Sequence, residues 1–246
     1  MSDPVEICVL GKKVRLLQPA GGFRTSLDSV MLAAACPAQK ADRVLELGCG
    51  VGGAAFCLLH RLPDIFITGI DVQSEYIDLA QKNIGLNNGS DRCEFIKNDV
   101  RSFEVPMDAR FDHVICNPPF LEAGTYMSAT NEGRAIALAH TEKDLTLKDW
   151  VDGAFRNLKA GGSVTIIHRA DMTDRILQAL GKRFGAVEII PLWPRLGEAA
   201  KRVIIRARKD RKTPATLHAG LILHNEDGAY TQEAEAVLRE GTALFS

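Results

Sequence analysis

The sequence predicts an α/β fold built around a doubly wound, mostly parallel β-sheet of seven strands. Short runs rich in β-branched residues alternate with segments of helical periodicity, and a glycine-rich turn joins one such run to a helix. The last two runs are joined by about ten residues, which favours an antiparallel hairpin at a sheet edge. The predicted strands are Arg43–Leu47, Ile65–Asp71, Cys93–Lys97, Phe111–Cys116, Ser163–His168, Val187–Leu192 and Val203–Arg208.

Four predicted helices lie between these strands. The first follows the glycine-rich turn, over residues 54–62. Ser74 and Thr146 are typical N-cap residues, and each precedes apolar residues at helical spacing. The two glycines at 161–162 predict the end of the helix that Thr146 begins, immediately before a buried strand. A further short helix is expected over residues 171–180.

Composition and charge exclude several classes of protein. The 246 residues carry 30 basic and 31 acidic side chains, so the chain is neither a globally basic nucleic-acid binder nor a disordered acidic tail. The six cysteines form no CxxC pair and no cluster with histidine at zinc-ligand spacing, so we expect reduced thiols and no metal. The longest apolar run, about seven residues over 30–36, is too short for a bilayer, and we expect a cytoplasmic protein without membrane contact.

The chain is expected to form a single domain, residues 1–246, because it contains no repeat, low-complexity tract or flexible linker. We divide it into an N-terminal extension with a first helix (1–38), a catalytic core (39–208) and a tail packed on the core (209–246). The extension, the tail and the stretch 121–145 lie outside the predicted sheet. Substrate recognition is therefore expected in those three segments.

A glycine-rich loop follows the first predicted strand. Gly48, Gly50 and Gly52 allow positive φ and close approach of a ligand, and the helix beyond offers unpaired N–H groups. By itself this pattern also describes an ordinary tight turn between a strand and a helix. Glu46, two residues before the first glycine, would repel a phosphate but not a cationic or hydroxyl-rich ligand. A pyrophosphate site is therefore disfavoured.

Two further acids follow neighbouring strands. Asp71 ends the second strand and is placed to accept hydrogen bonds from ribose hydroxyls, or alternatively to cap the next helix. Asp99 follows the third strand and lies at the same edge of the sheet, where it can accept a hydrogen bond from an adenine amino group. The ligand that suits these acids is an adenosine carrying a positive centre and no phosphate.

These residues resemble the Rossmann-like class of S-adenosylmethionine-dependent methyltransferases, whose acid-x-Gly-x-Gly-x-Gly loop is matched by Glu46 to Gly52. The resemblance implies that the loop cradles the methionine part, that Asp71 binds the ribose, and that Asp99 with the Val100 backbone holds the adenine. It also implies the antiparallel hairpin at the end of the sheet. The residues assigned to S-adenosylmethionine are Glu46, Gly48, Gly50, Gly52, Asp71, Val72, Asp99, Val100, Asn117 and Asp28.

The fourth strand runs directly into Asn117, Pro118, Pro119 and Phe120, which we assign as the catalytic residues. The prolines fix φ and remove N–H donors, which leaves a stiff loop with carbonyl acceptors. The Asn117 side chain and the Pro118 carbonyl can each accept one N–H of a planar amine, while Phe120 can stack on its ring. A proline-stiffened turn without function is the alternative. The motif resembles that of the amino-methyltransferases, which act on adenine N6, cytosine N4 or a glutamine amide.

Two longer segments resemble the bacterial tRNA (adenine-N6)-methyltransferase family, which modifies an anticodon-loop adenine of a valine tRNA. They are Gly22-Phe-Arg-Thr-Ser-Leu-Asp28-Ser-Val-Met-Leu32 and the tail from Gly228 through Glu233 to Leu238. The resemblance implies a helix start near the cofactor for Asp28, although a plain N-terminal helix acid is an equal alternative. Arg24 is a candidate substrate contact.

A basic stripe supports an RNA partner. Residues 195–212 hold eight basic and two acidic side chains within a nearly neutral chain. Such a stripe can neutralise phosphates while a base is turned out of an RNA loop, or it can protect an edge strand from aggregation. The residues assigned to RNA contact are Arg24, Lys201, Arg202, Arg206 and Arg208.

Together these observations predict an S-adenosylmethionine-dependent N-methyltransferase that forms N6-methyladenosine in RNA, most plausibly tRNA. Two alternatives remain open from the residues alone. One is a protein glutamine-N methyltransferase of the release-factor type, which shares the Asn-Pro-Pro-Phe turn. The other is an RNA-binding module that keeps the fold without turnover.

Overall fold

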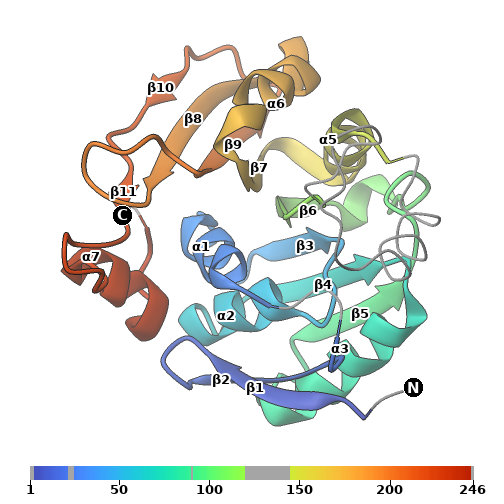
Figure 1. Ribbon diagram of the computed structural model, residues 1–246. Helices are drawn as coiled ribbons and strands as arrows, with labels where there is room; N and C mark the ends of the chain where they lie inside the picture. The colour runs from blue at the N-terminus through green and yellow to red at the C-terminus, as the bar shows by residue number, and fades with distance from the viewer. Residues whose placement is uncertain (1–2, 22–24, 90, 120–144, 245–246) are drawn as a thin grey trace.

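A central β-sheet organises the computed structural model, which describes residues 3–21, 25–89, 91–119 and 145–244. Its strands follow the order β10-β8-β9-β7-β6-β3-β4-β5, and β11 also pairs with β8 (Figure 1). The strands are β3 (Arg43–Leu47), β4 (Phe66–Asp71), β5 (Cys93–Lys97), β6 (Phe111–Cys116), β7 (Leu158–Arg169), β8 (Phe184–Trp193), β9 (Arg202–Lys209), β10 (Thr216–Leu217) and β11 (Leu221–Ile222).

The predicted strands are all present, three of them with the predicted ends: β3, β5 and β6. The main difference is β7, which begins at Leu158 and not at Ser163. The helix before it ends at Asn157, so Gly161 and Gly162 do not stop a helix but lie within the strand. Gly161 has φ of 75°, and the pairing of β6 with β7 shifts register between Phe111 and His113. The glycines thus allow the strand to take an irregular backbone conformation at this point.

The C-terminal part of the sheet is antiparallel, as predicted, but it is not an edge hairpin. β9 lies between β7 and β8 and is antiparallel to both. The outer side of β8 is covered by the two-residue strands β10 and β11. Strands of that length carry no periodicity, which is why the sequence predicts seven strands where the described residues form a sheet of nine.

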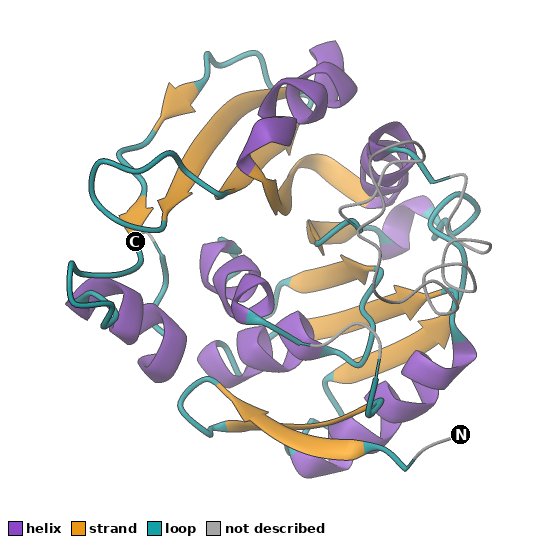
Figure 2. Cartoon of the chain, viewed as in Figure 1, coloured by secondary structure: helices purple, strands orange, loops and turns teal. Residues whose placement is uncertain are grey.

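Helices cover both faces of the sheet (Figure 2). α1 (Leu27–Ala35), α2 (Gly53–Arg61) and α3 (Ser74–Leu86) contribute to one apolar core, which includes Phe56 and Met31. α5 (Leu147–Asn157) and α6 (Thr173–Leu180) contribute to the other, around Phe111. These two layers confirm a doubly wound sheet. Short 3₁₀ turns are η1 (Met107–Ala109), η2 (Ala170–Met172) and η3 (Gly181–Arg183).

The two predicted N-caps have different outcomes. Thr146 caps α5 as part of a capping box: its hydroxyl accepts from Asp149 N–H, and the Asp149 carboxylate accepts from Thr146 N–H. Ser74 is instead the first residue of α3, and Gln73 occupies the cap position without a side-chain bond. The helix expected over 171–180 is a 3₁₀ turn followed by α6. The helix expected over 54–62 lies one residue earlier.

The N-terminal segment contains a β-hairpin that the sequence did not predict. β1 (Val5–Val9) and β2 (Val14–Gln18) pair antiparallel and form a separate two-stranded sheet. The hairpin lies beside α3 in Figure 1, and β2 contacts that helix. Val14 and Leu16 enter the main core, whereas β1 is largely exposed.

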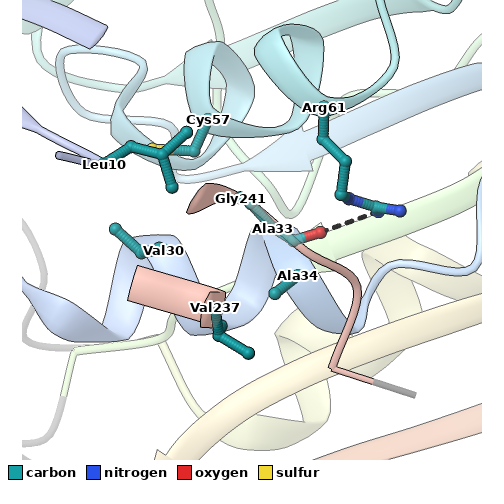
Figure 3. Close-up of a pocket in the computed structure, with 8 residues that line it drawn as sticks. All are labelled: Leu10, Val30, Ala33, Ala34, Cys57, Arg61, Val237 and Gly241. Atoms are coloured by element: carbon teal, nitrogen blue, oxygen red, sulfur yellow. Dashed lines mark hydrogen bonds between the residues drawn. The ribbon is translucent and has the colours of Figure 1, made fainter. Parts of the chain in front are cut away.

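The C-terminal segment packs on α1 and α2. It contains α7 (Gln232–Glu235) and a π-helical turn, η4 (Ala236–Glu240). Figure 3 shows Val237 and Gly241 of this segment facing α1, with Arg61 of α2 donating to the Ala33 carbonyl. The cavity left between them is about 10 Å³, room for a single water molecule at most. This contact is therefore packing and not a ligand site.

Five neighbouring strands of the sheet, β7, β6, β3, β4 and β5, are parallel. Their carboxyl ends meet at one edge, which is where open α/β sheets bind ligands. The described helices include none long and apolar enough to cross a membrane.

The capping box gives a stability prediction. Thr146→Ala removes the bond to Asp149 N–H, and we expect it to lower the free energy of unfolding by about 1 kcal/mol in urea denaturation. Ser74→Ala is the matched control, because Ser74 lies at a helix start without capping it. Equal losses in the two variants would contradict this assignment of the caps.

Candidate active site

The glycine loop leaves β3 at the ligand edge and enters α2. Gly48, Gly50 and Gly52 have φ of 63°, 52° and 85°, so each adopts the left-handed conformation that glycine favours. A Cβ on Gly48 would lie 2.5 Å from the Trp150 ring, so this glycine permits α5 to pack on the loop. Among the described residues, a Cβ on Gly50 would meet no atom within 4 Å. The Gly50 side of the loop therefore faces open space.

Glu46 lies beneath this loop and is almost fully buried, with 5% of its surface exposed. Its Oε2 accepts a hydrogen bond of 2.9 Å from Ala55 N–H in the first turn of α2. Burial raises the pKa of Glu46 to about 8, against the lowering effect of the Ala55 N–H bond and with a smaller raising effect from the charge of Asp71. Glu46 is therefore a carboxyl group that a nearby cation would ionise.

Asp71 ends β4 and closes the loop across the sheet edge. Its Oδ2 accepts from Gly50 N–H and its Oδ1 accepts from Gln73 N–H, both at 2.9 Å. Burial raises its pKa, against the lowering effect of these backbone donors. The carboxylate thus organises the loop and holds the residue that precedes α3, although it does not cap that helix. The ribose contact stays a prediction. Val72 follows it and is half-buried.

Asp99 lies two residues beyond the end of β5, at the same edge. Arg101 Nη2 donates to its Oδ2 at 2.6 Å, and this pairing lowers the pKa of Asp99. Its carboxylate therefore stays ionised and oriented. Val100 is buried, and its carbonyl accepts from Arg156 at 2.9 Å.

Asn117 is the first residue after β6. Cys116 pairs with Leu47 in the adjacent β3, so Asn117 and Gly48 follow neighbouring strand ends. The Asn117 Oδ1 atom is buried and accepts no hydrogen bond among the described residues. A buried acceptor without a donor costs about 1–3 kcal/mol, which is unusual unless a ligand supplies the donor. Pro118 is buried and Pro119 exposed, while Phe120 lies outside the described residues.

Asp28 lies in the first turn of α1, behind the N-cap Ser26. Arg202 Nε donates to both of its carboxylate oxygens at 3.1 Å. The structure therefore engages Asp28 in an ion pair between α1 and β9. A contact of Asp28 with the cofactor remains a prediction.

The basic stripe does not form one surface. Arg202 is opposite Arg169 at the carboxyl end of β7, whereas Arg208 is opposite Ser163, six residues or roughly 20 Å along β9. Lys201 and Arg202 are thus at the edge that holds Asn117, and Arg208 is at the opposite edge. β9 is an interior strand, so protection of an edge strand does not explain its charges.

The side chains of two other members of the stripe bind groups within the protein. Arg206 is paired with Glu188 at 2.5 Å and donates to the Ala35 carbonyl. Lys209 is buried and donates to the carbonyls at the end of α5. The RNA role expected for Arg206 is therefore not supported by its position. Arg24 lies outside the described residues.

Three residues at this edge were missed as site residues. Trp150 was not assigned to the site, and its buried ring packs against Gly48. Arg169 ends β7 at the ligand edge, and its position after a predicted strand would have marked it. Asn83, inside α3, is fully buried and touches the glycine loop. A polar residue on the apolar face of a helix was the available signal for Asn83.

Charge and shape together define what the site accepts. Glu46 and Asp71 are acidic groups beside the loop whose pKa values burial raises, so a cationic ligand would favour their ionised forms and a phosphate would oppose them. The open side of Gly50 allows backbone contact, and Asn117 offers an acceptor to a donor. Within the part of the chain that the structure describes, no three His, Cys, Asp or Glu side chains are grouped to hold a metal ion.

The chain is similar to several named sequences. It is 26% identical over 223 residues to a tRNA1(Val) (adenine(37)-N6)-methyltransferase of Shewanella baltica, covering 89% of this chain and 92% of the relative. It is 28% identical over 185 residues to a protein of the same name from Bacteroides thetaiotaomicron, covering 74% and 76%.

A solved structure and a family profile agree with these relatives. A predicted O-methyltransferase from Agrobacterium tumefaciens superposes with a TM-score of 0.72 at 27% identity, covering 89% of this chain and 98% of its own. The family described as methyltransferase small domain matches residues 21–192, which is most of the chain and includes the glycine loop, Asp71, Asp99 and Asn117. The chain therefore belongs to the methyltransferase small domain family.

Proposed function

We propose that this methyltransferase transfers a methyl group from S-adenosylmethionine to the exocyclic N6 amine of an adenine in tRNA. The observation that carries the proposal is the buried Oδ1 of Asn117 beside the glycine loop, which has no hydrogen-bond partner in the part of the chain that the structure describes. An acceptor in that position suits a substrate that brings an N–H. The relatives named tRNA1(Val) (adenine(37)-N6)-methyltransferase support adenine in tRNA as that substrate, and a tRNA substrate implies action in the cytoplasm.

The residues present fit S-adenosylmethionine. Its methionine part would lie on the open side of Gly50, its positive charge near Glu46 and Asp71, and its adenosine toward Asp99 and Val100. When bound, the donor supplies a methyl group on a positively charged sulfur. We also propose that the backbone of Val72 and Gly52 contacts S-adenosylmethionine, since Val72 follows Asp71 and Gly52 belongs to the glycine loop.

The protein's own contribution to the reaction is mainly positioning. The N6 amine of adenine is a poor nucleophile, because its lone pair is delocalised into the ring. Asn117 Oδ1 and the Pro118 carbonyl would each accept one of its N–H groups, which turns the lone pair toward the methyl donor. The proton is released after transfer, when the nitrogen carries a positive charge and is strongly acidic. Phe120 would stack on the ring.

The test is transfer of labelled methyl groups from S-adenosylmethionine into unmodified bacterial tRNA, followed by nucleoside analysis. Labelled N6-methyladenosine is the expected product. Label that is sensitive to protease and not to nuclease would instead identify a protein glutamine-N methyltransferase. Label on a hydroxyl of a small molecule would favour the activity named for the Agrobacterium neighbour. Binding of the donor without transfer to any acceptor would leave an inactive RNA-binding module.

Asn117→Ala tests the catalytic assignment. Loss of a preorganised hydrogen-bond partner should reduce kcat by about 10²–10³-fold. The Kd for S-adenosylmethionine should change only a few-fold, since the Asn117 side chain is proposed to bind the substrate amine and not the methyl donor. Asn225→Ala, at an exposed asparagine in the C-terminal segment, is the control and should retain full activity. Near-normal kcat in Asn117→Ala would contradict the mechanism.

The split basic stripe gives a second prediction about RNA. Lys201 is exposed at the edge that holds Asn117, and Arg208 is exposed at the far edge. Lys201→Ala should raise the KM for tRNA and reduce the salt dependence of binding by about one counterion. Arg208→Ala removes the same charge and should change neither. Equal effects of the two substitutions would mean that RNA does not approach along the ligand edge.

The raised pKa of Glu46 predicts that binding of the donor releases a proton. Glu46 is largely neutral at pH 7 in the free protein, because its pKa is about 8, and a cation beside it would ionise it. Calorimetry at pH 7 in buffers of different ionisation heat should find close to one proton released per S-adenosylmethionine bound, and almost none with Glu46→Gln.

The same pKa determines how stability depends on pH. The pKa of Glu46 is higher in the folded than in the unfolded chain, so its contribution to stability is complete below about pH 4.5 and is lost as pH rises through about 8. Glu46→Gln should lack this loss. A decline between pH 5 and 8 that is the same in both proteins would show that another group is responsible.

A further inference from the structure

Asn83 connects three segments of the molecule through one side chain. It lies in α3 and is completely buried. Its Oδ1 accepts from Leu17 N–H at 2.7 Å, and its Nδ2 donates to the Leu17 carbonyl at 3.0 Å and to the Val51 carbonyl at 3.1 Å. Leu17 belongs to β2 of the N-terminal hairpin, and Val51 is in the glycine loop.

Asn87 forms the same bidentate bond to the hairpin without touching the loop. Its Oδ1 accepts from Arg15 N–H at 3.0 Å and its Nδ2 donates to the Arg15 carbonyl at 2.7 Å. Four residues along a helix advance 6 Å, and two residues along a strand advance about 6.6 Å. Two asparagines one helical turn apart therefore match alternate residues of β2. They pair with its free edge as another strand would.

The bond to Val51 completes the fixation of the loop. Cys49 N–H donates to the Ile70 carbonyl, Gly50 N–H to Asp71, and Gly52 N–H to the Cys49 carbonyl. The peptide group between Val51 and Gly52 is thus held at both its carbonyl and its N–H. Without Asn83, the Val51 carbonyl would be buried without this donor.

Apolar contacts connect the same three segments: the hairpin, α3 and the glycine loop. Val51 packs with Tyr76 and Leu79 of α3, and Leu17 of the hairpin packs against that small cluster. The hairpin, the helix and the loop therefore form one continuous unit next to the methyl-donor site. No charged group participates in these contacts, so their effect is on shape.

We propose that Asn83 is a positioning residue for the methyl donor, which it serves by fixing the Val51 carbonyl and with it the conformation of the glycine loop. The inference rests on the proposed function only in that the loop binds S-adenosylmethionine. It does not depend on which acceptor is methylated. Asn87 also anchors the hairpin, but it makes no bond to the glycine loop.

The experiment compares Asn83→Asp and Asn83→Leu with Asn87→Asp in the full-length chain. Asn83→Asp keeps an acceptor for Leu17 N–H but loses the donor to Val51, and Asn83→Leu loses all three bonds without adding charge. Asn87→Asp makes the same chemical change at a side chain that contacts the hairpin and, within α3, the Asn83 carbonyl, but not the glycine loop. Calorimetric titration with S-adenosylmethionine gives the Kd, at a temperature where circular dichroism shows each variant folded.

We expect both Asn83 variants to weaken donor binding at least tenfold, with KM for the donor raised more than kcat is lowered. Asn87→Asp should bind within twofold of the wild type. Ile176→Ala, in the core on the opposite face, controls for general destabilisation and should also keep its affinity.

Two results would overturn the proposal. One is an Asn83 variant that is folded and binds the donor within twofold of the wild type. The other is an equal loss in Asn87→Asp, which would assign the effect to hairpin docking and not to the Val51 carbonyl. Wild-type protein that binds the donor but does not methylate tRNA would refute the proposed acceptor and leave this inference standing.

Discussion

The site depends on one constraint: the chain must turn from β3 into α2 over the glycine loop while the peptide groups of that turn are removed from water. Each such group needs a partner inside the protein. Asp71 supplies an acceptor for Gly50 N–H from the neighbouring strand, and Glu46 does the same for Ala55 N–H from below. The side chains that shape the site are thus first of all those that satisfy its backbone.

The electrostatic character of the site follows from that solution. Backbone N–H groups are satisfied by acidic side chains, so the loop acquires two buried carboxyl groups whose pKa values burial raises. A buried carboxyl is costly to ionise, and Glu46 resists ionisation accordingly. A cationic ligand removes this cost, whereas a phosphate would add to it. The preference for a positively charged adenosine derivative is therefore a consequence of how the turn is stabilised.

The sequence predicted the parts of the structure in which local pattern and long-range contacts agree. β3, β5 and β6 have the predicted ends, and each is bounded by polar or turn residues. Thr146 was recognised as a cap and Ser74 was mistaken for one. The difference is the residue three positions later: Asp149 can return the bond to the cap, whereas Ile77 cannot.

Contacts between segments far apart in the chain could not be predicted from the sequence. The hairpin β1–β2 is held by Asn83 and Asn87, about 70 residues away, and these contacts cannot be read from its ten strand residues. The stripe around β9 was seen as a concentration of charge, but only the register with β7 separates Lys201 and Arg202 from Arg208. The positions of charges along a strand, and not their number, determine which of them face the ligand edge.

On the proposed function, the turn at Asn117 also explains why the product is released after one methyl transfer. The prolines that follow prevent the chain from relaxing around the unpaired Oδ1, so its cost persists until a donor arrives. An unmethylated amine carries two N–H groups and can satisfy both Asn117 and the Pro118 carbonyl. The methylated amine retains one N–H, so one acceptor is again left unpaired. The site therefore binds the substrate amine better than the product, which favours transfer of a single methyl group and release of the product.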